Sequence, residues 1–241
     1  MKKWIAFCTV VLALLFTITA NTQTAQAATI PYDSEGFDDT YTYPLGQKPD
    51  EWEAFQAESL IQDEVYNSAS QAFKVIEATN ERDAALTLDN LGTTDNFTYS
   101  MAVYVPLGAL VSIGLSNPME KDLPLNRLYF YNDEIYFLDR NGEQITVDYF
   151  KSDSWCEVSV EIDGFTGSSA TAKVTVDGTW YGETFDAYNA SDCGSELQLD
   201  CTMMTGNHFY VDDVVVIPEP ATLGMLGLGG LLMVARRQRR S

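Results

Sequence analysis

Between residues 28 and 217, apolar and polar side chains alternate with a period of two in one segment after another. Successive side chains of a β-strand point to opposite faces, so this alternation directs one face of each segment toward a core and the other toward water. The segments are 97–105, 125–131, 134–138, 155–162, 170–176 and 209–216. We therefore predict an all-β fold, an antiparallel β-sandwich.

Turn residues separate several of these predicted strands. Asn132-Asp133, Asn141-Gly142 and Asp177-Gly178 each predict a tight hairpin. Residues 51–64 have mixed spacing that allows a turn of helix. The stretch 28–217 is long enough to bury one substantial core, and we predict a single domain there.

The N-terminus has the features of a secretory signal peptide. Two lysines precede an apolar stretch over 4–18, and Ala25-Gln26-Ala27 has the small-x-small pattern that signal peptidase accepts. We predict that 1–27 is the signal peptide and that the mature chain starts at Ala28, with cleavage one residue later as a close alternative. The protein is therefore expected to be exported.

Three elements follow one another at the C-terminus: Pro218-Glu219-Pro220, an uncharged run over 221–235, and a tail over 236–241 that contains Arg236, Arg237, Arg239 and Arg240. As a helix that rises about 1.5 Å per residue, the uncharged run spans roughly 22 Å, which is short of a hydrocarbon core of roughly 30 Å. It predicts a short transmembrane helix that anchors weakly. The arginines keep their end cytoplasmic by the positive-inside rule, and the prolines favour an extended triplet outside the bilayer.

The order and spacing of these elements resemble the PEP-CTERM sorting segment of Gram-negative bacteria. The resemblance implies that 218–241 is recognised by an exosortase, a membrane protein that processes its substrates near the triplet. It implies export across the inner membrane, transient anchoring, and then delivery to the cell surface or the extracellular polysaccharide matrix. An ordinary single-pass anchor with a chance Pro-Glu-Pro is the alternative.

The mature body is strongly acidic. Residues 28–217 hold eight of the fourteen basic residues and thirty-four of the thirty-five acidic ones, a formal net charge of −26. Such a charge repels nucleic acid and anionic membrane surfaces, so we expect no nucleic-acid partner. Cations, or neutral and cationic glycans, fit better; alternatively, the charge serves only solubility.

Cysteine spacing suggests one disulfide. Cys8 leaves with the signal peptide, and Cys193 and Cys201 bracket a short loop that is cheap to close, so we predict that these two pair. Cys156 lies on the apolar face of its strand and is expected to be a buried thiol. Bonds from Cys156 to either partner remain open, and zinc is not expected because His208 is the one histidine.

A second resemblance covers most of the body. Its motifs are Glu35-Gly-Phe-Asp38, Leu45-Gly-Gln47, Trp52, the strands 155–163 and 173–178, and Tyr210-Val-Asp-Asp-Val214. They resemble the concanavalin A-like jelly rolls, which implies that the first and last strands lie side by side. The resemblance also implies a structural calcium ion, for which Glu35, Asp38 and Asp213 are candidate oxygen ligands. Alternatively, these are exposed acids at strand ends.

The predicted strand over 155–163 carries part of a catalytic pattern. Some concanavalin A-like glucanases carry Glu-x-Asp-x-x-Glu on one strand, and this chain has Glu161 and Asp163 but ends the pattern with Thr166. Glu157, Glu161 and Asp163 are expected on one face, a spacing compatible with glycoside hydrolysis. No G-x-S-x-G elbow is present. We predict that the protein is not an enzyme.

Trp180 and Tyr181, just beyond the Asp177-Gly178 turn, are the aromatic pair that we expect to be exposed and available to stack on a glycan. The leading hypothesis is a non-catalytic, exosortase-processed protein of the surface or biofilm matrix that binds carbohydrate. A calcium-dependent structural or adhesive surface protein is the second, and an atypical glycoside hydrolase is the third.

Overall fold

The computed structural model describes residues 32–38, 42–50, 52–54, 59–67, 71–77, 83–88, 91–117, 124–202 and 208–218. The predicted signal peptide with Ala25 and Ala27, the uncharged run over 221–235 and the four tail arginines lie outside these ranges, as do Glu219 and Pro220. Within them, no helix has the length and apolar character needed to cross a membrane.

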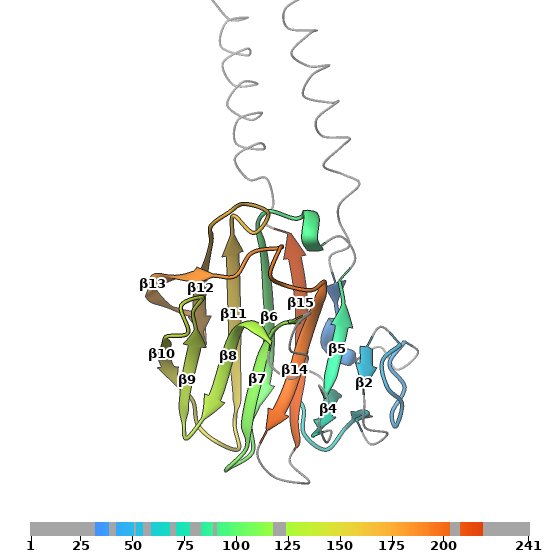
Figure 1. Cartoon of the computed structure of the whole chain (residues 1–241). Coiled ribbons are helices and arrows are strands. Elements are labelled where there is room, and N and C mark those ends of the chain that lie inside the picture. Colours follow the sequence, from blue (N-terminus) through green and yellow to red (C-terminus); the bar gives the residue numbers. More distant parts are fainter. Residues whose placement is uncertain are drawn as a thin grey trace, which may run out of the picture.

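Two antiparallel sheets pack face to face (Figure 1). One has the order β13 (Thr179–Ala187), β12 (Ala170–Val176), β11 (Trp155–Asp163), β6 (Phe97–Tyr104), β15 (His208–Pro218), β4 (Ala72–Ile76) and β3 (Ile61–Gln62), with β1 (Tyr32–Asp33) also pairing β15. The other has the order β10 (Gln144–Tyr149), β9 (Glu134–Leu138), β8 (Leu125–Tyr131), β7 (Leu110–Leu115), β14 (Glu196–Thr202), β5 (Ala84–Thr87) and β2 (Trp52–Ala54). We call them the eight-stranded and the seven-stranded sheet.

The predicted all-β sandwich is confirmed. Each segment with period-two alternation contains a strand, and β11 alternates between buried and outward residues along its length. The described residues of 51–64 form β2 and β3 rather than a turn of helix. Two short 3-10 helices, η2 (Glu35–Phe37) and η3 (Leu91–Thr93), complete the elements of the described ranges.

The predicted turns join neighbouring strands. Asn132 and Asp133 have φ values of 51° and 64°, which gives the two-residue hairpin between β8 and β9 the left-handed conformation that asparagine and aspartate tolerate. Asp177 and Gly178, at φ values of 45° and 74°, do the same between β12 and β13. Local sequence therefore fixes these two hairpins.

The core lies between the sheets and is rich in aromatic rings. Trp52, Phe97 and Tyr99 are among the largest fully buried side chains, so Trp52 packs in the core and does not face a ligand. In β8, Phe130 is buried and Tyr129 and Tyr131 are half-buried on the opposite face. Burying these apolar surfaces supplies the main stabilisation of such a fold.

The first and last strands lie side by side, as the jelly-roll resemblance implies. Tyr32 and Asp33 of β1 pair with Val216 and Val215 of β15. The contact continues at Ser34, whose N–H donates to the Val214 carbonyl at 2.9 Å and whose Oγ accepts from the Val214 N–H at 2.8 Å. The start of the body is thus fixed to its end.

The predicted disulfide is wrong, because Cys156, Cys193 and Cys201 are all free thiols. Cys193 precedes β14 and Cys201 lies near the far end of that strand, where it pairs with Val111. The extended chain from Glu196 to Cys201 alone spans about 16 Å, well beyond the roughly 7 Å between Cα atoms that a disulfide allows. The residues between the two cysteines form a strand instead of a closed loop.

Candidate functional site

The outer face of the eight-stranded sheet carries two adjacent rows in which most side chains are small. Strand register sets Thr175, Ser159 and Ser100 next to one another across β12, β11 and β6. The next row along the strands contains Glu157 and Ala102. Because hydroxyl and methyl groups are short, the sheet surface is low along the Thr175 row and at Ala102, while the Glu157 side chain stands above it.

A row of aromatic rings lies next to the Glu157 row. Trp155, Tyr104 and Tyr210 follow one another across β11, β6 and β15. Their rings meet edge to face, at 5.7 Å between the centroids of Tyr104 and Trp155 and 5.6 Å between those of Tyr104 and Tyr210. His208 lies two residues before Tyr210 on β15, and its ring is 5.3 Å from that of Tyr210.

An ion pair lies on the opposite side of the small rows. The Lys173 Nζ donates to the Glu161 Oε2 at 2.8 Å, and it lies 5.6 Å from the centroid of the Trp180 ring. Trp180 pairs with Thr175 at the β13 edge. A groove of about 370 Å³ occupies this face, lined among others by Ser100, Ala102, Glu157, Ser159, Thr175 and Asp213.

Trp180 and Tyr181 are exposed, as predicted, at 49% and 37% of their surface. Their side chains lie on opposite faces of the eight-stranded sheet, because consecutive residues of a strand point in opposite directions. Trp180 lies beside the groove with Thr175 and Lys173. Tyr181 stacks on Phe185 at 5.5 Å, and Phe185 stacks on the buried Phe137 of β9 at 4.9 Å. Of the two, only Trp180 therefore lies on the face that carries the groove, next to the lining residue Thr175.

Two carboxylates line the groove. Glu157 is exposed on β11, and its N–H donates to the Asp177 Oδ1 at 2.8 Å, which secures this end of the strand. Asp213 sits in an irregularity of β15 at φ 50°, and its Oδ2 accepts from the Asn67 side-chain amide at 3.1 Å. None of the described residues that line the groove is basic, so its potential is negative.

The predicted calcium ligands are spread over two elements. Glu35 belongs to η2, Asp38 follows it, and Asp213 lies in β15. Among the described residues, no group of three or more His, Cys, Asp or Glu side chains could hold a metal ion. The calcium site stays a prediction, which calorimetric titration of the secreted protein with calcium tests directly.

The acids of β11 share a face, as expected for Glu157, Glu161 and Asp163. Glu161 is engaged by Lys173, its cross-strand partner on β12. An ion pair at a cross-strand position stabilises the pairing of β11 with β12. Glu161 therefore has a structural role within the sheet.

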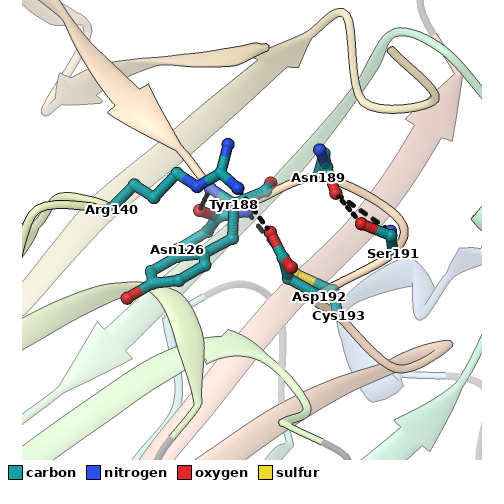
Figure 2. Close-up of polar contacts among 7 residues, drawn as sticks. All are labelled: Asn126, Arg140, Tyr188, Asn189, Ser191, Asp192 and Cys193. Carbon is teal, nitrogen blue, oxygen red and sulfur yellow. Dashed lines mark hydrogen bonds and ion pairs between the residues drawn. The ribbon is translucent and has the colours of Figure 1, made fainter. Parts of the chain in front are cut away.

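A separate polar cluster anchors the loop that joins β13 to β14 (Figure 2). Asn126 is buried at φ 50°; its Nδ2 donates to the Tyr188 carbonyl at 2.9 Å and its Oδ1 accepts from the Tyr188 N–H at 2.6 Å. Arg140 pairs with Asp192 of the same loop at 3.3 Å. Since Asn126 mimics a strand partner for Tyr188, the cluster is structural and no part of the groove.

Burial also keeps the thiols inert. It raises the pKa of Cys156 and of Cys193 to about 12 in each case, with nearby acids adding to the effect. Burial likewise raises the pKa of Cys201. A thiol that stays protonated near neutral pH is a poor nucleophile and a poor metal ligand.

Sequence reasoning missed the aromatic row. Tyr104, Trp155 and Tyr210 lie far apart along the chain and each occupies an ordinary outward strand position. Only the order of β11, β6 and β15 in the sheet makes them neighbours. Alternation could have placed each on an outer face, but it could not have placed them together.

Comparisons with known proteins agree with the predicted C-terminal sorting segment and with the β-sandwich fold. Residues 216–240 match the PEP-CTERM protein-sorting motif. The chain therefore carries this sorting motif, which implies export and exosortase-mediated sorting to the surface. No curated protein sequence matches the chain.

Among solved structures, the endo-β-1,4-glucuronan lyase of the fungus Trichoderma reesei is similar at a TM-score of 0.50 and 13% identity, over 79% of this chain and 95% of that one. Alginate lyase Aly36B is similar at a TM-score of 0.49 and 11% identity, over 78% of this chain and 96% of that one. The PL-14 alginate lyase of Aplysia kurodai is similar at a TM-score of 0.45 and 12% identity, over 72% of this chain and 97% of that one. The likeness to the glucuronan lyase, at a TM-score of 0.50, concerns the fold alone and agrees with the predicted concanavalin A-like antiparallel sandwich.

Proposed function

We propose that the mature protein is a non-catalytic carbohydrate-binding protein of the cell surface or the extracellular polysaccharide matrix, and that the groove over the eight-stranded sheet takes the glycan. The observation that carries the proposal is the half-exposed Trp180 ring beside Thr175, which lines the groove together with the hydroxyl groups of Ser159 and Ser100. A sugar ring has an apolar face that stacks on an indole and a rim of hydroxyls that bond to polar groups. Delivery by the sorting motif supports the location.

The acidity of the groove narrows the class of glycan. Glu157 and Asp213 face the groove within a body of net charge −26. Polyanionic chains such as glucuronan or alginate would be repelled, although solved proteins of this fold are named as lyases of those polymers. Neutral or cationic polysaccharides suit the site instead.

Two features argue for binding without catalysis. Glu161, the central acid of β11, is held by Lys173 at 2.8 Å. The two carboxylates that line the groove, Glu157 and Asp213, stand on β11 and β15 with β6 between them, so their strands lie about 10 Å apart, at the upper end of the roughly 5 to 9.5 Å between carboxyl groups that glycoside hydrolysis uses. A glycan would therefore be held and not cut.

The test is a glycan array probed with the secreted mature protein, followed by calorimetry on the best neutral and cationic hits. We expect Trp180→Ala to weaken binding about tenfold, since one stacked ring contributes about 1.4 kcal/mol. Tyr149→Ala is the matched control, because Tyr149 is an exposed ring on β10 of the other sheet. Equal affinity of Trp180→Ala and wild type, or release of reducing sugar from the bound glycan, would contradict the proposal.

A further inference from the structure

The sorting motif begins inside the folded sandwich. Its match starts at residue 216, and β15 continues to Pro218. In the sheet, Val216 pairs with Tyr99, Ile217 with Thr98 and Pro218 with Phe97. The first proline of the Pro-Glu-Pro triplet is thus a residue of the eight-stranded sheet, with no linker between body and signal.

The partner of this strand end is firmly held. Phe97 is buried and packs edge to face on Phe165 at 5.1 Å. The residues before it grip the loop after β11: the Asn96 Oδ1 accepts from the Gly164 N–H at 3.0 Å, and the Asp95 Oδ1 accepts from the Thr166 hydroxyl at 2.6 Å. The start of β6, next to η3 in Figure 1, therefore cannot follow β15 out of the sheet.

Burial decreases from Val216 to Ile217 at the end of β15. Val216 is buried and paired on both sides, with Tyr32 of β1 and Tyr99 of β6. Among the described residues, Ile217 pairs with Thr98 of β6, and 41% of its surface is exposed. Opening the strand at the exposed Ile217 therefore costs less free energy than opening it at the buried Val216.

A processing enzyme binds its target segment in an extended form. The triplet ends two residues beyond Pro218, and two residues of chain reach at most about 7 Å from the last strand pair. We propose that processing requires the last two pairs of β15, Ile217 with Thr98 and Pro218 with Phe97, to open first. The folded body then limits how often the motif is presented, and the processing rate follows the open fraction. The binding of glycan has no part in this step.

The experiment measures the rate of precursor processing by pulse-chase in cells that carry the matching exosortase. Thr98→Gly weakens the Ile217 pair from β6 and leaves the matched residues intact. We expect processing to become about threefold to fivefold faster, since strand preference spans roughly 1 kcal/mol and each 1.36 kcal/mol is tenfold in rate. Thr171→Gly, at a half-buried outward position of β12, is the matched control and should leave the rate unchanged.

A second variant keeps the test decisive if Thr98→Gly folds poorly. A Gly-Ser-Gly-Ser insertion between Ile217 and Pro218 moves the triplet out of the sheet, and the same insertion between Asn141 and Gly142 is its control. We expect the first insertion to speed processing at least as much as Thr98→Gly, and Thr98→Gly to add nothing to it. An unchanged rate for the insertion, or an equal gain in Thr171→Gly, overturns the proposal.

Discussion

On the eight-stranded sheet the outward Thr175, Ser159 and Ser100 are half-buried and floor a groove, whereas on the seven-stranded sheet the outward Ser112 and Asp200 are buried. Both sets arise from the same alternation of polar and apolar residues. The difference lies in the surroundings of each sheet and not in the strands themselves. Polar residues on an outer face mark a candidate site only where they are also accessible.

The buried set is an internal network. The Gln198 side-chain amide donates to the Asp200 Oδ2 at 2.9 Å, and the Cys201 N–H donates to the Asp83 carboxylate. The Asp83 N–H in turn donates to the Asp200 Oδ1 at 3.3 Å. These side chains continue the pairing of β5 with β14 beyond Ala84, so they contribute stability where the groove offers binding.

We expect the largest loss of stability from Gly114→Ala in the seven-stranded sheet. A Cβ at Gly114 would lie 2.5 Å from the Leu125 carbonyl oxygen and 2.9 Å from the Arg127 Cβ, so β8 would have to shift. We expect the free energy of unfolding to fall by about 3 kcal/mol, measured by urea unfolding. Gly92→Ala, where nothing lies within 4 Å, is the control, and equal stability of the two variants would show that β8 yields freely.

Asp83→Ala should lower the free energy of unfolding somewhat less than Gly114→Ala does. It leaves the Cys201 N–H buried without its carboxylate acceptor, which costs about 2 kcal/mol and lowers the melting temperature by about 4 to 8 °C. Glu157→Ala, an exposed acid on the other sheet, should stay within about 0.5 kcal/mol of wild type. A similar loss of stability in both variants would mean that polar residues contribute equally to stability on the two outer faces.

A gradual loss of stability is expected at alkaline pH. Burial raises the folded-state pKa of Cys156 from 9.0 to about 12, so the folded protein binds the proton more tightly than the unfolded chain does. The stabilisation is complete below about pH 9 and is lost as the pH rises toward 12. Urea unfolding from pH 8 to 11 should show a shallower decline of the unfolding free energy in Cys156→Ala; identical slopes would mean that folding does not raise the pKa of this thiol.

The smallest effect should be electrostatic. We expect Glu157→Gln to weaken binding of a glucosamine oligomer about twofold to threefold and to reduce its salt dependence, because a solvent-exposed charge contributes under 1 kcal/mol. Glu143→Gln, on the exposed β9–β10 turn, is the control. Glucosamine oligomers that bind both variants alike would assign recognition to Trp180 and the hydroxyl floor.

Much of the fold was predictable because strand signals are local. Alternation located the strands, and Asp177-Gly178 located a hairpin, because side-chain direction and left-handed turn conformations depend on neighbouring residues. The exposure of Trp180 followed from its place just after that turn. The disulfide prediction failed because the spacing of Cys193 and Cys201 does not reveal that a strand separates them.

By itself, the sequence determined the all-β character, the acidity of the body and the sorting motif, since composition and short motifs act without reference to distant residues. Tertiary structure decided which outward residues meet. The groove needs Thr175, Ser159 and Ser100 in one row, and strand order and register, which follow from packing between segments far apart in the chain, create that row. The same register placed Pro218 in the sheet, where the sorting signal meets the fold.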